Sequence, residues 1–288
     1  MSRAIVLAAP AKINLSLEVV GRRDDGYHEL RSIFATVDLA DRVRVAEART
    51  LDVRIRPDVA APAGLDLATR AVQRLAAAIG RPPVAHVRIR KRIPVAAGLG
   101  GGSSDAGAVL RGLAALWGVD GDLGPVAASL GSDVPFFVSG AAYAAVSGRG
   151  EAVQALVPPR VPLWAVLVRV GARVPTPAVF AALRTEEWSD GAATAGLAAA
   201  FVDGTVDPAV LRAHARNSLL AAAERVCAPI GEARSLAEGL GIALSLSGSG
   251  PTLFWIANDR ADALRIARLL RRRGLVARAH PLGVPRSR

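Results

Sequence analysis

The feature that most limits how this chain can fold is the glycine run at residues 98–102, which holds four glycines in five positions. Glycine adopts backbone angles that other residues resist, and it lets backbone amides approach a ligand closely. An apolar strand precedes the run, and apolar residues at helical spacing follow it from Ala106. We expect Ser103 or Ser104 to cap that helix. Loop amides with a helix dipole behind them predict an anion site, in particular one for polyphosphate.

This loop differs from the common phosphate-binding motifs. No lysine follows the glycines as a P-loop requires, and the chain has no His-Arg-Asp catalytic loop of the protein-kinase type. Ser103 is the small residue that the Rossmann dinucleotide-binding motif requires three positions after Gly100. The acidic residue that this motif requires further downstream is missing. The simpler alternative is a flexible glycine turn at the surface, which the flanking apolar strand and helix disfavour.

Composition narrows the class of protein. Apolar residues make up 51% of the chain and charged residues 21%, which is typical of a globular protein. Cys227 is the only cysteine, so no intramolecular disulfide forms, and the scattered histidines predict no metal-ligand cluster. The longest apolar run, near Ala192–Val202, is too short to span a bilayer. The N-terminal stretch Ala4–Ala9 is typical of a strand rather than a signal peptide, so we expect a cytoplasmic protein without a membrane segment.

Positive charge is concentrated at the C-terminal end. The net charge is +11, and residues 260–288 hold nine arginines against one acid, Asp262. In the helix expected from about Asp259 to Arg273, alanine, isoleucine and leucine share one face and arginines another. A solvated helix face with a basic tail is the simpler interpretation. RNA or an acidic partner is the alternative, but no aromatic residues are interleaved, and we expect no nucleic-acid binding.

Lysine is rare in this chain. Only Lys12 and Lys91 occur among 36 basic residues, and the others are arginines. Lysine is a compact point charge and arginine a wide planar fork, so a retained lysine marks a place that arginine does not fit. This argument favours Lys12 as functional. Lys91 lies in an Arg-Lys-Arg run, and we interpret it as incidental.

Patterns along the chain predict an α+β protein with two lobes that meet near residue 160. Strand-like segments dominate the first half, at Ile5–Ala8, Lys12–Val19, Val43–Ala46, Leu51–Ile55 and Val84–Arg90. Helical segments dominate the second half, at Pro177–Leu183, Pro208–His214, Ser218–Val226 and Pro229–Gly239. A strand pair at Ile242–Leu246 and Thr252–Ala257 adds a small antiparallel sheet. We therefore expect a strand-rich lobe over residues 1–160 and a helix-rich lobe over residues 161–288.

Three further segments are candidates for chemistry. Asp133 precedes an apolar segment, and a partly desolvated aspartate there suits a general base toward a hydroxyl, although an ordinary turn aspartate is the simpler alternative. Residues 247–250 (Ser-Gly-Ser-Gly) are typical of a tight hairpin, or form a second wall of the phosphate pocket. Tyr27 and His28 follow a turn; they suit stacking on a base and hydrogen bonding to its edge, or a half-buried tyrosine beside a surface histidine.

Taken together, these segments resemble the GHMP kinases, named for galactokinase and the homoserine, mevalonate and phosphomevalonate kinases. The resemblance spans residues 9 to about 257. Its phosphate-loop motif falls on Pro94, Gly98, Leu99, Gly100, Gly101, Gly102, Ser103 and Ser104, and its C-terminal glycine motif on Ser247, Gly248, Ser249 and Gly250. Segments 9–15, 23–30 and 131–135 are similar to those of family members that act on a methylerythritol linked to cytidine diphosphate.

The resemblance implies a two-lobed kinase that uses ATP and Mg²⁺ to phosphorylate the 2-hydroxyl of that small molecule, in the non-mevalonate route to isoprenoids. Asp133 would take the hydroxyl proton, and Lys12 would orient Asp133 and offset developing charge. The loop at residues 98–104 would hold the ATP phosphates. The implied substrate contacts are Asn14, Tyr27, His28, Thr176 and Phe180, with Tyr27 and Phe180 on the two faces of the cytosine.

Two alternatives stay open at this point. One is a homoserine or mevalonate type of GHMP kinase, whose substrates carry no base for Tyr27 to stack on. The other is a non-catalytic RNA-binding module that uses the arginine-rich end. Two departures from the family pattern, at Ser218 and Asp66, weaken any role for those positions. The oligomeric state does not follow from the sequence.

Overall fold

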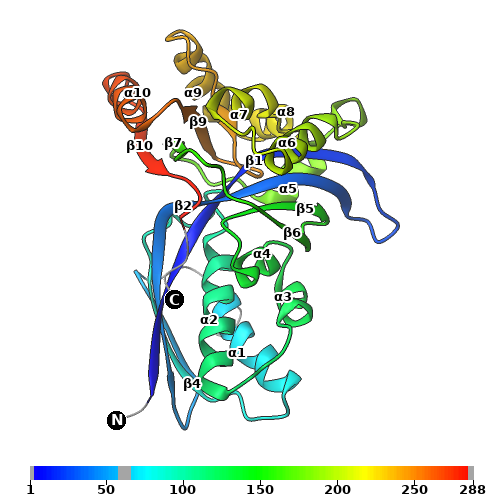
Figure 1. The fold of residues 1–288 in the computed structure, drawn as a ribbon, viewed down its shortest axis with the longest axis vertical. Helices are drawn as coiled ribbons and strands as arrows, with labels where there is room; N and C mark the ends of the chain where they lie inside the picture. The colour runs from blue at the N-terminus through cyan, green and yellow to red at the C-terminus, as the bar shows by residue number, and fades with distance from the viewer. Residues whose placement is uncertain (1–2, 58–65, 285–288) are drawn as a thin grey trace.

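The computed structural model describes residues 3–57 and 66–284. The described chain forms two β-sheets with helices packed against them (Figure 1). The strands and helices confirm the α+β class, because a mostly antiparallel sheet with its helices is followed by a second, smaller sheet with its own helices.

The larger sheet is built on two long strands. β1 (Ala4–Arg22) and β2 (His28–Glu47) pair antiparallel along nearly their whole length. The sheet runs in the order β3-β4-β2-β5-β6, with β1 added on β2. Its shorter strands are β3 (Asp52–Arg56), β4 (Ala85–Arg90), β5 (Tyr143–Gly148) and β6 (Ala152–Leu156). The expectation of two separate strands before residue 20 is wrong, because the strand continues through Pro10 with only a shift of register between Pro10 and Ala11.

Four helices accompany this sheet: α1 (Leu67–Ala78), α2 (Gly101–Trp117), α3 (Gly124–Leu130) and α4 (Val134–Ser139). The apolar faces of α1 and α2 pack on strand residues such as Val43, Val45 and Val87. The prediction that Ser103 or Ser104 caps α2 is wrong. Gly100 is the N-cap residue instead, because its left-handed backbone (φ 68°) turns the chain into the helix earlier, and no side chain caps the helix.

The smaller sheet is antiparallel and runs in the order β10-β7-β9-β8. Its strands are β7 (Trp164–Arg169), β8 (Ser245–Leu246), β9 (Thr252–Ala257) and β10 (Val276–Pro281). The helices around it are α5 (Thr176–Ala182), α6 (Ala192–Val202), α7 (Pro208–His214), α8 (Leu220–Val226), α9 (Ala228–Glu238) and α10 (Arg260–Arg272), with a 3₁₀ turn, η1 (Thr185–Glu187).

The C-terminal end is part of this sheet rather than only a basic tail. In α10 the residues Ala263, Ile266, Ala267 and Leu270 are buried, as the helical pattern predicts. β10 then pairs with β7 over six residues. The prediction of a basic tail after this helix is therefore wrong for the described residues up to 284, because backbone pairing with β7 holds this segment in the fold.

The two long strands reach both parts of the molecule. In Figure 1, β1 and β2 run from the end that holds α1 and α2 to the end that holds α5 and α6. Leu17 and Val19 of β1 pack in one apolar cluster with residues of β7, α8 and α9. The division at residue 160 stays a prediction, since the hydrophobic cores share residues from both sides of it. Among the described helices, none has the length and apolar character needed to cross a membrane.

Candidate active site

The glycine loop joins β4 to α2 and is shaped by its glycines. Gly98 and Gly100 have φ values of 73° and 68°, a region that residues with a Cβ resist. The first hydrogen bond of the helix joins the Ser104 amide to the Gly100 carbonyl at 2.8 Å. The amides of residues 101–103 therefore precede the helical ladder. This is the arrangement of donors that an anion requires.

The second glycine turn, residues 247–250, packs directly against the first. Ser247 Oγ donates a hydrogen bond to the Gly98 carbonyl at 3.0 Å. A Cβ built on Gly98 would lie 2.6 Å from the Ser247 carbonyl oxygen and 2.7 Å from that of Gly250. Only glycine allows this approach, so the two turns form adjoining walls of one site although about 150 residues separate them in sequence.

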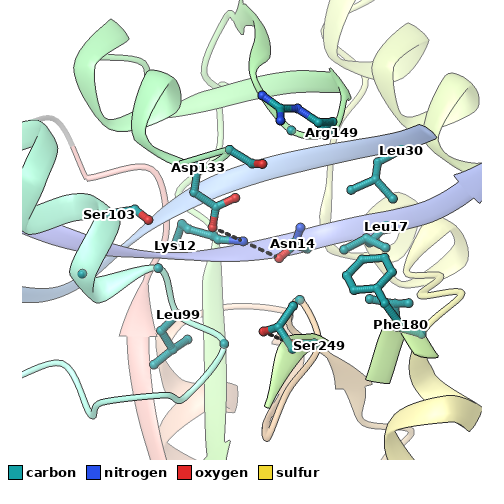
Figure 2. A pocket seen from close by; sticks show the side chains of 18 of the residues that line it. Lys12, Asn14, Leu17, Leu30, Leu99, Ser103, Asp133, Arg149, Phe180 and Ser249 are labelled. Atoms are coloured by element: carbon teal, nitrogen blue, oxygen red, sulfur yellow. Dashed lines mark hydrogen bonds and ion pairs between the residues drawn. The ribbon is translucent and has the colours of Figure 1, made fainter. Parts of the chain in front are cut away.

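Lys12 and Asp133 meet beside these turns. Lys12 Nζ lies 3.2 Å from Asp133 Oδ2, and the Lys12 side chain is 5% exposed whereas that of Asp133 is 29% exposed. Figure 2 shows the two side chains pointing toward one another across the cleft, Lys12 from β1 and Asp133 from the turn before α4. A buried ammonium beside a reachable carboxylate suits proton removal from a hydroxyl group.

Asn14 and Phe34 fix the Lys12 ammonium. Residues two apart on a strand face the same side, so Asn14 lies beside Lys12 and its Oδ1 accepts a hydrogen bond from Nζ at 2.8 Å. The Asn14 amide nitrogen donates to Ser32 Oγ at 2.9 Å. The ammonium also lies 4.1 Å from the centroid of the Phe34 ring, a cation–π contact. The lysine therefore has one well-defined position.

Aromatic side chains gather at the other end of the cleft. The rings of His28 and Phe180 stack with centroids 5.1 Å apart, and Trp188 meets His28 edge-on at 6.2 Å. Tyr27 is 54% exposed, and the Arg149 guanidinium lies 4.8 Å from the centroid of its ring. Burial, and to a smaller extent Arg22, lowers the pKa of His28, so its imidazole is neutral at pH 7.

One cleft of about 1070 Å³ joins all of these groups. Its size suits a site that binds two substrates, since a single small-molecule site occupies about 300–1,000 Å³. Every predicted site residue lines it except Ser104, Ser247 and Gly250, which are buried. Thr176 Oγ1 and Ser249 Oγ lie 2.8 Å apart and tie α5 to the second glycine turn. The roles of these residues stay predictions, but the structure brings them together.

Several residues near the cleft were missed from the sequence. Lys91 is not incidental, because its ammonium pairs with Asp41 at 2.5 Å and with Asp105 at 2.6 Å. The scarcity of lysine, which favoured Lys12, applied equally to Lys91. Asn217 Nδ2 donates to the carbonyls of Leu246 and Gly248, both at 2.8 Å, and thereby supports the second glycine turn.

The departures noted at Asp66 and Ser218 have structural explanations. Asp66 caps α1, because its carboxylate accepts hydrogen bonds from the amide and the hydroxyl of Thr69 at 2.8 and 2.6 Å. Ser218 Oγ accepts from the Val19 amide at 3.2 Å, which joins the segment before α8 to β1. Asp66 also lines the cleft, whereas Ser218 does not.

Comparison with known proteins agrees with this geometry. The N-terminal domain of GHMP kinases matches residues 66–141, and the C-terminal domain of GHMP kinases matches residues 206–275. The chain is 40% identical over 265 residues to 4-diphosphocytidyl-2-C-methyl-D-erythritol kinase of Thermus thermophilus, covering 91% of each protein.

Solved structures extend the comparison to the fold. A crystal structure of 4-(cytidine 5'-diphospho)-2C-methyl-D-erythritol kinase superposes with a TM-score of 0.78 at 38% identity, over 97% of this chain and 100% of that one. Homoserine kinase from Cytophaga hutchinsonii superposes with a TM-score of 0.71 at 18% identity, over 98% and 95%, a likeness of fold alone. With both domains matched, and with a relative that is 40% identical over nearly its whole length, this chain belongs to the GHMP kinase family.

Proposed function

We propose that this protein transfers the γ-phosphoryl group of ATP to the 2-hydroxyl of 4-diphosphocytidyl-2-C-methyl-D-erythritol, a step in non-mevalonate isoprenoid synthesis. The observation that carries the proposal is that one cleft holds a glycine loop at one end, an aromatic cluster at the other, and the Lys12–Asp133 pair between them. The relatives that are 37–40% identical over most of the chain have the same named activity. A base-stacking end favours this substrate over homoserine or mevalonate.

The chemistry assigned to the pair is simple and balanced. Asp133 takes the proton of the 2-hydroxyl group while the hydroxyl oxygen attacks the γ-phosphorus and forms the new O–P bond. The bond from the γ-phosphorus to the β–γ bridging oxygen breaks, and ADP is released. Lys12 holds Asp133 in place and offsets negative charge on the reacting oxygens. Phosphoryl transfer needs mainly such positioning and electrostatic stabilisation.

The aromatic end is assigned to the cytosine. Tyr27 and Phe180 supply ring faces, and the neutral imidazole of His28 can both donate and accept a hydrogen bond at the base edge. Asn14, which contacts Lys12, and Thr176, which contacts the second glycine turn, are assigned to the methylerythritol part. Tyr27, His28 and Phe180 all line the cleft, which supports the assignment of the base to this end.

The glycine end is assigned to the ATP phosphates, with the amides of residues 101–103 as donors. Among the residues that the structure describes, no group of three or more His, Cys, Asp or Glu side chains could hold a metal ion. We expect a Mg²⁺ bound with ATP to be held mainly by the phosphate oxygens of the nucleotide. When bound, that ion would neutralise phosphate charge.

The proposal extends to organisation and location. We assign residues 1–160 to the lobe that carries the glycine loop and residues 161–288 to the lobe that carries the second glycine turn. Because the proposed reaction consumes ATP, we expect the enzyme in the cytoplasm, where biosynthetic kinases draw on that nucleotide. A small-molecule substrate accounts for the residues that line the cleft, and the proposed function assigns no role to the arginine-rich C-terminal end.

An acceptor panel tests the function. The protein is incubated with ATP and Mg²⁺ and with the cytidine diphosphate alcohol, homoserine or mevalonate, and ADP release is measured. We expect turnover only with the cytidine compound, and turnover with homoserine or mevalonate alone would refute the proposal.

Asp133→Asn should lower kcat by about 10²–10⁴-fold, the usual contribution of a general base, and leave ATP binding unchanged.

The matched control for that variant is Asp120→Asn, since Asp120 is exposed and does not line the cleft. It should behave as the wild type. If Asp133→Asn retains full turnover, Asp133 is not the base. The RNA-binding alternative has a separate signature, because RNA affinity would fall steeply with salt concentration.

A further inference from the structure

A second charged cluster lies at the base of the glycine loop, where two of its residues also line the cleft, and it takes no part in the proton transfer. It consists of Asp41 of β2, Lys91 just after β4 and Asp105 of α2, and we call it the loop-base cluster. The three side chains are 0%, 8% and 6% exposed, respectively. Three buried charged groups in contact are costly unless each is paired, so their position needs a reason.

The cluster closes the ends of the glycine loop on each other. Lys91 precedes the loop and Asp105 follows it, and their side chains meet at 2.6 Å. Asp41 anchors the same point to the sheet, because its Oδ1 accepts hydrogen bonds from the amides of Arg92 and Ile93. The thirteen residues 92–104 therefore form a loop whose base is tied by ion pairs to a central strand.

The cluster also contacts the loop backbone itself. A Cβ built on Gly101 would lie 3.3 Å from Lys91 Nζ and 2.9 Å from Ile93 Cγ2. The ammonium thus lies against the first turn of α2, where the free amides are. Two of the three donors of the ammonium are used by the two carboxylates, so Lys91 is committed mainly to holding the base of the loop.

We propose that Lys91 and Asp105, held by Asp41, are positioning residues for ATP: they keep the loop amides aimed into the cleft. This inference rests on the proposed function, since it assumes that the loop binds the phosphates of ATP. It explains how an acidic residue is tolerated next to a phosphate loop. Asp105 lines the cleft, and its negative charge is paired there with Lys91.

The charge of this cluster changes near neutral pH. Burial raises the pKa of Asp105 to about 7, because lost hydration and the neighbouring Asp41 together outweigh the attraction of Lys91. Burial lowers the pKa of Lys91, but the Asp105 and Asp41 carboxylates outweigh it and raise the pKa overall. Asp105 is therefore protonated below about pH 7 and ionised above it, where its negative charge at the cleft repels ATP.

The first test exploits the difference between lysine and arginine. In Lys91→Arg the wide guanidinium does not fit the space between the two carboxylates and Gly101. We expect the Kd for ATP, measured by calorimetry on the free protein, to rise about tenfold because the loop amides are displaced. Arg90→Lys is the matched control, because Arg90 is exposed, precedes the loop and does not line the cleft, and it should bind ATP as the wild type does.

The second test uses Asp105→Asn, which keeps the shape and removes the ionisation. The ratio of the wild-type Kd for ATP to that of the variant should rise severalfold from pH 6 to pH 8.5. Taking the ratio cancels the titration of ATP itself. Asp105 is protonated at the low end of this window and ionised at the high end, so the sign is a loss of wild-type affinity with rising pH.

The outcomes separate the inference from the proposed function. If Lys91→Arg changes only thermal stability, and the Asp105→Asn ratio is flat with pH, the cluster is structural and the inference is wrong. If Lys91→Arg does not fold, the Asp105→Asn ratio alone decides. ATP binding needs no alcohol substrate, so a wild type that binds ATP but phosphorylates no cytidine compound would refute the function and still allow this test.

Discussion

At the scale of single residues, the two lysines of this arginine-rich chain occupy two different kinds of site. Lys12 lies between a reachable carboxylate, Asp133, and the amide oxygen of Asn14. Lys91 lies between two buried carboxylates. Both sites require a compact cation with tetrahedral donors, which arginine does not provide. In a chain that otherwise uses arginine, both retained lysines therefore mark sites of close packing.

Tyr27 gives a prediction at this scale. Its ring is exposed and already carries the Arg149 guanidinium, so it is available to stack on a base. Tyr27→Ala should raise the KM for the cytidine substrate about tenfold, within the about 1–3 kcal/mol of a base–aromatic stack, with little change in kcat. Tyr27→Phe keeps the ring and should match the wild type in steady-state kinetics. Equal KM values for all three proteins would remove Tyr27 from the base site.

At the scale of elements, the site depends on two glycine turns that touch. Helix α2 begins at a glycine rather than at a capping serine, so its first amides stay free for a ligand. β1 also contributes as a whole, because one continuous strand carries Lys12 and Asn14 on one face and pairs with β2, which carries Ser32 and Phe34. A break in this strand would separate the groups that hold the ammonium.

Gly98→Ala tests the contact between the turns. The new Cβ would lie 2.6 Å from the Ser247 carbonyl oxygen, so the turns must move apart and the KM for ATP should rise about tenfold or more. Gly80→Ala is the matched control, since Gly80 has a similar φ of 66° but nothing within 4 Å of its Cβ. That variant should lose only about 1–2 kcal/mol of stability and keep its KM. Indistinguishable kinetics for the two variants would contradict the role of the contact.

At the scale of the whole molecule, the C-terminal segment returns to the first sheet. Leu282 forms a bridge with Val37, its amide donates to the Leu163 carbonyl at 2.9 Å, and its side chain is buried. The Gly283 amide donates to the Thr36 carbonyl, and Thr36 pairs with Lys12 across the strands. The end of the described chain thus supports the strand pair that carries Lys12.

Leu282→Ala should lower the free energy of unfolding by about 2–5 kcal/mol, the usual cost of a buried leucine truncated to alanine. Chemical denaturation measures this directly, and kcat below the unfolding transition should stay near that of the wild type. Val157→Ala, at a side chain 76% exposed, should change stability by less than about 0.5 kcal/mol. If both variants unfold at the same denaturant concentration, the C-terminal segment does not contribute to the core.

The sequence alone determined the local features and the family resemblance. The glycine loop, the Asp133 turn and most helices follow from neighbouring residues, because backbone preference and hydrophobic periodicity act over a few positions. The tertiary structure decided what depends on distant residues. It placed Lys91 between Asp41 and Asp105, joined two expected strands into β1, and brought residue 98 within contact of residues 247–250. These arrangements depend on strand register and close packing between segments far apart in sequence, which local patterns do not encode.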